Sequence, residues 1–217
     1  MKLAVFSYRF AAEILEAPQF SDAKNQLFSV LEATPVLTLT RPKPPRRAGF
    51  KGDPFTTDQK AINKWFDKQF KDNQWDWHPD ITEDGVTQLK ADFRKGGLLV
   101  EIQFGNMARW YTDVFKMQVS YSLGKTEVGV LVAPTQSFAA TIDENIAYYE
   151  RIVRELPYAK MSITLPILVV GLYPTPEMAP LLRREPSRPS RRSRQPKGTS
   201  ALPVEGVRGL PGREDGE

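Results

Sequence analysis

Hydrophobic and polar positions along the chain follow the two periods that distinguish helices from strands. Apolar side chains recur at helical spacing in several segments, at residues 11–17, 21–33, 58–71, 107–119 and 143–156. Shorter alternating or continuous apolar runs predict strands at residues 2–8, 35–40, 87–94, 97–104, 127–133 and 162–172. Because strands and helices alternate, we expect one α/β domain with a central mixed sheet flanked by helices over residues 1–175.

The stretch KADFRKGGLLVEIQFGN, residues 90–106, is predicted to form a β-hairpin. Gly96 and Gly97 join its two strands, and paired glycines are typical of tight hairpin turns. Asp92 lies before this turn and Glu101 after it, on neighbouring strands. We therefore expect the two carboxylates to face one space.

Alternation along the second strand of this hairpin separates its side chains onto two faces. Leu99, Glu101 and Gln103 share one face, and Ile102 lies with apolar neighbours on the other. The pattern has two interpretations. A carboxylate and an amide on one face of a strand are common on a solvated sheet of a purely structural domain, and they also occur in catalytic sites.

The catalytic interpretation rests on the chemistry of paired carboxylates. Asp92 and Glu101 repel each other when they are brought together, and a cation between them removes that repulsion. A hard divalent ion such as Mg²⁺ takes oxygen ligands, and the carbonyl of Ile102 could add a third. Gln103 is neutral, so it could orient an attacking water but could not accept its proton.

Composition narrows the possible chemistry. The 217-residue chain has no cysteine and one histidine, His78. Disulfides, thiolate sites, cysteine nucleophiles and multi-histidine metal sites are therefore excluded or nearly so, and any metal must be held by oxygen. No apolar run is long enough to span a bilayer or to form a signal peptide, so we expect a soluble intracellular protein with no membrane partner.

Charge is concentrated near the C-terminus. Residues 181–200 hold seven basic side chains and one acidic one, so they carry +6 and leave −2 for the rest of a chain of net charge +4. Residues 176–217 are rich in Pro, Arg and Ser, and we expect a disordered tail there. The basic loop with Lys43, Arg46, Arg47 and Lys51 either clamps phosphates or is simply solvated.

Several blocks of the sequence resemble type II restriction endonucleases of the BglII and BstYI family, in the PD-(D/E)xK nuclease superfamily. ADFRKGGLLVEIQFGN resembles that family's Asp…Val-Glu-x-Gln-Phe-x-Asn motif at the same spacing, including a glutamine where most of the superfamily has lysine. YRFAAEILEAPQF, DPFTTDQKAINKWFDKQFKDNQW, SFAATIDENIAYYERIVRELPYA and LPILVVGL are similar to other blocks in the same order. The resemblance covers residues 1–173 and implies a restriction-endonuclease-like fold.

The resemblance implies roles for individual residues. Asp92 and Glu101 would bind the metal together with the Ile102 carbonyl, and Gln103 would position the water. Asn73 is the candidate for an asparagine that family members have upstream of the motif. The DNA-contacting residues would be Asn106, Arg109, Gln136, Ser137 and Thr141.

The function implied by the resemblance is Mg²⁺-dependent cleavage of double-stranded DNA by a homodimer in the cytoplasm of a prokaryotic cell, without a nucleotide cofactor. The site would be a short palindrome centred on GATC, cut with a 5′ overhang. The family continues with structured segments after the last strand, whereas this chain turns into the Pro/Arg-rich sequence. The alternative is therefore a relative that binds DNA without cutting it.

Overall fold

A computed structural model describes residues 1–45, 54–82 and 88–178, all within one compact unit, Met1–Pro186. Its centre is a six-stranded mixed sheet in the order β1-β8-β7-β6-β5-β4. Strands β6, β7 and β8 are parallel, and the remaining pairs are antiparallel. The strands are β1 (Lys2–Tyr8), β4 (Asp76–Trp77), β5 (Phe93–Lys95), β6 (Leu98–Ile102), β7 (Val128–Pro134) and β8 (Ile167–Tyr173). The expected mixed sheet is confirmed.

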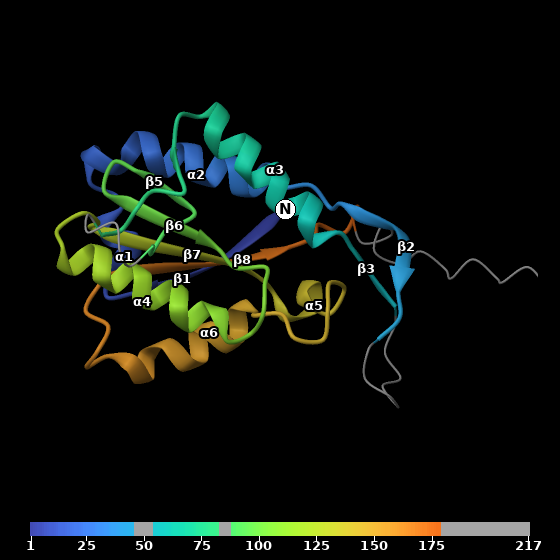
Figure 1. Cartoon of the computed structure of the whole chain (residues 1–217). Helices are drawn as coiled ribbons and strands as arrows, with labels where there is room; N and C mark the ends of the chain where they lie inside the picture. The colour runs from blue at the N-terminus through green and yellow to red at the C-terminus, as the bar shows by residue number, and fades with distance from the viewer. Residues whose placement is uncertain (46–53, 83–87, 179–217) are drawn as a thin grey trace, which may run out of the picture. The chain divides into compact units, whose positions relative to one another are not determined.

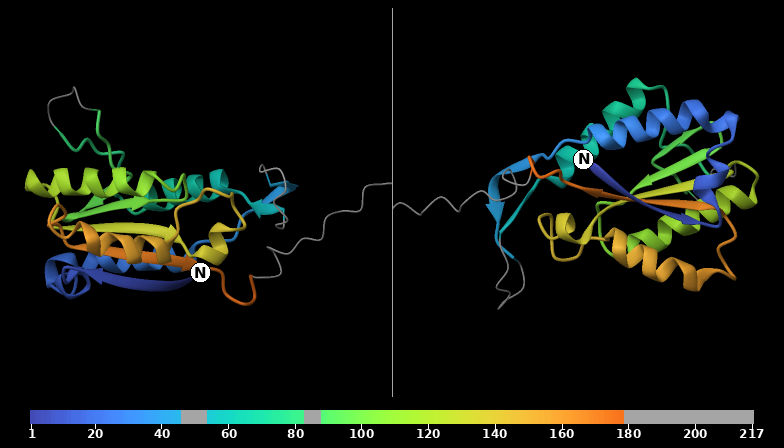
Figure 2. Two further views of the ribbon diagram at one scale, coloured as in Figure 1. Left: turned by 90° about the horizontal axis from the view of Figure 1, so that it is seen from below. Right: turned by 180° about the vertical axis from the view of Figure 1, so that it is seen from behind.

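Helices cover both faces of this sheet (Figure 1). Helices α2 (Ser21–Ala33) and α3 (Gln59–Asp72) lie on one face, and α4 (Arg109–Ser122) and α6 (Tyr149–Glu155) lie on the other. The same three layers are visible from behind, in the right-hand view of Figure 2. Since both faces are covered, the central strands are buried on both sides and read as nearly continuous apolar runs.

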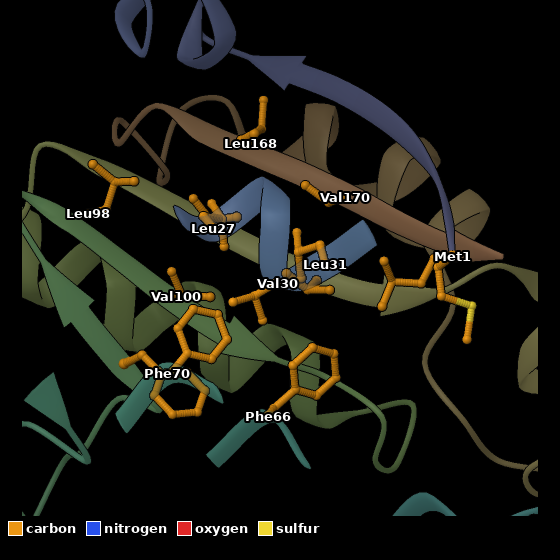
Figure 3. Packing of buried hydrophobic residues seen from close by; sticks show 14 of the residues in the cluster. Met1, Leu27, Val30, Leu31, Phe66, Phe70, Leu98, Val100, Leu168 and Val170 are labelled. Atoms are coloured by element: carbon orange, nitrogen blue, oxygen red, sulfur yellow. The ribbon is translucent and has the colours of Figure 1, made fainter. Parts of the chain in front are cut away.

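Strand β6 contributes to both halves of the core. Leu98 and Val100 pack towards Phe66 and Phe70 of α3, together with α2 (Figure 3). Leu99 points the other way, into the cluster beneath α4. Glu101 follows this alternation, so its carboxylate lies on the side of α4 and not on a solvated surface.

The predicted hairpin is present, with shorter strands than expected. Gly96 and Gly97 form its two-residue turn with φ of 53° and 82°, a left-handed conformation that glycine adopts without strain. Phe93 pairs with Val100 across the hairpin. Asp92 therefore immediately precedes β5, at the point where the strand pairing begins.

The remaining elements are short. They are α1 (Ala11–Ile14), α5 (Gln136–Ala139), two 3₁₀ segments at Pro18–Phe20 and Leu156–Ala159, and a separate antiparallel pair, β2 (Thr38–Lys43) and β3 (Phe55–Thr57). Strand β4 lies in the segment between α3 and the hairpin, and the basic loop that contains Lys43 begins as the end of β2. In the described ranges no helix is long and apolar enough to cross a bilayer.

One helix begins later than its periodicity predicts. The sequence predicts a helix from residue 143, whereas α6 starts at Tyr149. The reason is backbone pairing with the segment after β6: the Met107 N–H donates to the Asn145 carbonyl at 3.0 Å, and the Ala147 N–H donates to the Gly105 carbonyl at 3.0 Å. These bonds use donors and acceptors that a helix would need.

Three expectations fall partly outside the described residues. Arg46, Arg47 and Lys51 of the basic loop lie in the gap at 46–53, and Lys43 is the last residue of β2. The polar loop before the hairpin has a gap at 83–87, and the tail from residue 179 onward is also outside the description.

Candidate active site

The hairpin brings Asp92 against the end of β6. The Asp92 carboxylate accepts the backbone N–H of Ile102 at 2.8 Å through Oδ2. Ile102 follows Glu101 directly, so this bond fixes the first acid beside the second. The juxtaposition expected from the hairpin is therefore present in the structure.

Glu101 is nearly inaccessible, with 2% of its surface exposed. Burial is the main cause that raises the pKa of Glu101 well above its ordinary value, and the charges of Asp92 and Asp113 raise it further. Lys116 opposes this, since its Nζ lies 2.7 Å from Glu101 Oε1. The contact is an ion pair without hydrogen-bond geometry, so among the described residues Glu101 Oε1 has no hydrogen-bond partner.

Helix α4 supplies two site residues that the sequence did not reveal, Asp113 and Lys116. The ammonium of Lys116 lies 3.1 Å from Asp113 Oδ1, one helical turn away. Burial raises the pKa of Asp113, and Lys116 counteracts that rise. Burial alone would lower the pKa of Lys116, but the charges of Glu101 and Asp113 outweigh it and raise the value.

A signal for Asp113 was present in the sequence. Trp110, Val114 and Met117 recur at helical spacing along α4, and all three are buried. Asp113 lies on this same face, between Trp110 and Met117, where a carboxylate is uncommon unless it has a partner. The position of a charged residue on the apolar face of a helix could therefore have identified Asp113 as a site residue.

Gln103 links β6 to α4. Its Nε2 donates to Oδ2 of Asp113, and its Oε1 accepts the backbone N–H of Gly105 at 2.8 Å. The side chain is buried, so both ends of its amide are fixed. The second amide hydrogen and the second lone pair of Oε1 remain for a water or a substrate oxygen.

These side chains line a cavity of about 530 Å³. It lies between α3 and α4, beside the β5–β6 hairpin, and contains all three predicted motif residues together with Asp113, Lys116 and Arg109. The lining also includes Gln59, Asn63, Phe66, Asp67, His78, Gln88, Leu89, Lys90, Phe93, Ile102, Gly105 and Thr112. A cavity of this size with polar groups converging from three elements is the natural place for chemistry.

His78 belongs to this lining, although the sequence predicts no catalytic role for it. Its backbone N–H donates to the Asp92 carbonyl at 3.0 Å, and its φ of 50° places it in the left-handed region. The imidazole stacks on Trp77 with ring centroids 4.2 Å apart. His78 is exposed, and the surface that carries it is the wall of the cavity.

The structure does not bring Asn73 to the cavity. This residue caps the end of α3, where its Nδ2 donates to the Gln69 carbonyl at 2.8 Å. Asn63, ten positions earlier and on the cavity side of the same helix, lines the site instead. The sequence pattern could not separate the two because a helix must be placed against the sheet before its inner face is known.

Four of the five predicted DNA contacts are exposed, and the fifth, Thr141, is half-buried. Asn106 and Arg109 are exposed near the cavity, and Gln136 and Ser137 are exposed at the start of α5. Thr141 is different, because its hydroxyl lies 2.7 Å from that of Thr57 and donates to the Phe138 carbonyl. Gln136 and Ser137 begin the short helix α5, and Thr141 follows its end.

The donor set fits a hard divalent cation. Asp92 and Glu101 offer carboxylate oxygens beside the Ile102 backbone, and Glu101 Oε1 is a buried oxygen without a hydrogen-bond partner in the described part of the chain. The charged neighbour of this oxygen is the Lys116 ammonium, 2.7 Å away, so the fit to a hard cation rests on the two carboxylates themselves. The described residues contain no cluster of three or more Asp, Glu, His or Cys arranged around a metal, so two carboxylates and the backbone must suffice, with waters.

Comparison with known proteins finds both a matching family and a similar fold. The family described as Restriction endonuclease BglII/BglIII matches residues 3–172 of the chain. A crystal structure of restriction endonuclease BglII complexed with a DNA 16-mer has a TM-score of 0.67 and 21% identity, covering 81% of this chain and 79% of that one. Free BglII has a TM-score of 0.58 and 20% identity, with 81% of each chain covered. These two likenesses establish the fold, and no individual curated protein matches the chain.

Proposed function

The chain belongs to the BglII/BglIII family of restriction endonucleases, which are type II site-specific deoxyribonucleases, and from this premise we propose that it cuts double-stranded DNA at a short palindrome with Mg²⁺ as its cofactor. The observation that carries the proposal is Asp92 fixed beside the buried Glu101 at the end of β6. A purely structural sheet gains nothing from burying that carboxylate close to two further acids, Asp92 and Asp113, whose charges act on it.

Each residue of the site has a definite task. Asp92, Glu101 and the Ile102 carbonyl would hold the cation, which would supply an acidified water and positive charge for the phosphate. Gln103 is anchored by Asp113 and Gly105, so its remaining amide hydrogen is oriented for the attacking water or a phosphate oxygen. Arg109, exposed at the cavity, faces the approaching phosphate backbone.

The finer features of the proposal follow from the family resemblance. The substrate is duplex DNA, in keeping with the complex that BglII forms with a DNA 16-mer. The target is a GATC-centred palindrome cut with a 5′ overhang, and a homodimer reads it because two-fold symmetry in the protein matches two-fold symmetry in the site. Asn106, Gln136 and Ser137 reach towards base edges from the accessible surface. The enzyme acts in the cytoplasm of a prokaryotic cell.

The deciding experiment compares the wild-type protein with Asp92→Asn on unmethylated plasmid DNA with Mg²⁺. The amide removes one metal-binding charge, so we expect a loss of cleavage of about 10³-fold or more, corresponding to several kcal/mol of transition-state stabilisation. Duplex binding should persist. Sequencing of the fragment ends reads out the palindrome and the overhang.

Asp72→Asn is the matched control, since Asp72 is an exposed acid paired with Lys68 at the end of α3, outside the cavity lining. It should cleave like the wild type. Binding without any nicks in the wild type, under every divalent metal, would instead support the alternative function of a DNA-binding relative.

A further inference from the structure

The ammonium of Lys116 lies in a cradle made of oxygens. Its Nζ is 2.7 Å from Glu101 Oε1, 3.1 Å from Asp113 Oδ1 and 3.1 Å from the carbonyl oxygen of Lys90, to which it donates a hydrogen bond. Only 14% of the side chain is exposed. Lysine is rarely buried to this extent unless its charge is paired, so α4 places a paired cation inside the cavity.

No other cation is in contact with Glu101 among the described residues. The ammonium of Lys90 pairs with Asp80 at 3.3 Å, and the motif position 103 carries a neutral glutamine. When all four groups are ionised, the carboxylates of Asp92, Glu101 and Asp113 together with Lys116 carry a formal charge of −2. That value matches a divalent cation, whereas the same cluster without the lysine would hold −3.

We propose that Lys116 is a positioning residue of the active site. Its ammonium holds the buried Glu101 carboxylate directly, in the orientation in which this carboxylate binds the metal. Through Asp113 it also holds the Gln103 amide in the orientation in which the amide contacts the phosphate. The inference rests on the proposed nuclease function. Its physical basis is that groups supporting a metal ligand fix that ligand's orientation and charge before the metal arrives.

The test measures metal binding apart from catalysis. Calcium or magnesium alone is titrated calorimetrically into the metal-free wild-type protein and into Lys116→Met, which keeps the length of the aliphatic stem but lacks the ammonium. We expect the divalent affinity to fall about 10- to 100-fold, the loss typical when a supporting partner of a metal ligand is removed. Single-turnover cleavage with Mg²⁺ should fall at least as much.

A double variant separates positioning of Glu101 from mere neutralisation of Asp113. Asp113→Asn combined with Lys116→Met removes one charge of each sign and keeps an acceptor for the Gln103 amide. It also leaves no unpaired acid on α4, so we expect it to fold at least as well as the single variant. If Lys116 acts on Glu101, the double variant stays as defective in metal affinity as Lys116→Met, whereas recovery to within about twofold of wild type would overturn the proposal.

Two further variants complete the comparison. Lys116→Arg retains the positive charge and should recover most of the metal affinity. Lys68→Met removes an exposed lysine on α3 and should bind metal and cleave like the wild type, which controls for net charge. An unchanged or tighter metal affinity in Lys116→Met would show that the ammonium merely competes with the metal, and the proposal would be wrong.

The outcomes also separate this inference from the proposed function. If the wild type binds metal and Lys116→Met binds it weakly, but neither cuts DNA, the nuclease proposal fails and the role of Lys116 stands. If the wild type cuts and Lys116→Met cuts equally well with the same metal affinity, the nuclease proposal stands and the proposed role of Lys116 fails.

Discussion

At the scale of single residues, Thr141 has a structural task that its position in the family motif did not suggest. Its hydroxyl donates to the Phe138 carbonyl at 2.7 Å, so the hydroxyl of Thr57, 2.7 Å away, must donate to Thr141. Its carbonyl accepts the N–H groups of Thr56 and Thr57 at 2.9 and 3.0 Å. Thr141 therefore attaches β3 to the segment after α5.

Thr141→Val is accordingly expected to reduce stability more than it alters the recognised sequence. The valine leaves the buried Thr57 hydroxyl without its acceptor, which costs about 1–3 kcal/mol. Chemical denaturation measures this loss. Thr141→Ser keeps the hydroxyl and should unfold at nearly the wild-type denaturant concentration. A stable Thr141→Val variant with a changed cleavage site would support the base-contacting role instead.

The motif acids could be predicted at this scale, while their partners on α4 could not. Asp92 and Glu101 are brought together by one hairpin, and a hairpin is readable from two glycines and an alternating pattern. Asp113 and Lys116 reach the same cavity only after α4 has docked on the sheet. No local pattern in the residues between Glu101 and these two side chains predicts that they come together. The sequence therefore did not reveal Lys116 as the basic residue of the site.

At the scale of elements, α6 rests on β8 through a contact that only glycine permits. A Cβ placed on Gly171 would lie 2.6 Å from the ring of Tyr149. Gly171 is also paired in the sheet on both sides, with Ala4 of β1 and Ala133 of β7. The aromatic ring and the strand backbone therefore lie in direct contact.

Gly171→Ala should destabilise the protein by about 1–3 kcal/mol, the usual cost of adding a methyl group to a packed interior. A double-mutant cycle with Tyr149→Ala checks the cause. In the Tyr149→Ala background the space is open, so the added methyl should cost much less. Equal costs in both backgrounds, measured by thermal unfolding, would place the strain in the strand and not in the helix contact.

The same element shows what limited the prediction of secondary structure. Residues 143–148 have a helical pattern, yet their backbone pairs with the segment after β6 through Asn145 and Ala147. Asn106 forms an isolated β-bridge with Ile146 in the same pairing, and this bridge places it beside the end of β6. Tertiary hydrogen bonds took precedence over local periodicity at the position where the site is built.

At the scale of the whole molecule, the sequence predicted the fold class, the hairpin and the family. The burial of both sheet faces explains why: continuous apolar strands and amphipathic helices leave few alternatives for an α/β layer arrangement. Charge was less informative. Residues outside 181–200 carry a net −2, and the cavity lining holds four acids (Asp67, Asp92, Glu101 and Asp113) against three basic side chains (Lys90, Arg109 and Lys116). We therefore expect DNA to be attracted by local basic groups and by a bound cation.

Removal of the C-terminal segment tests whether DNA is attracted by local basic groups of the folded part or by the basic residues that follow it. The compact unit ends at Pro186, and residues 187–217 contain seven basic and four acidic side chains but few apolar ones, too few to add a core. A chain ending at Pro186 is therefore expected to keep its melting temperature, its cleavage site and its Mg²⁺ requirement. The slope of log affinity against log salt for duplex DNA should also stay the same, since each phosphate contact contributes about 0.9 to that slope. A slope shallower by two or more would show that the segment binds phosphates and supplies the positive charge that the cavity lacks.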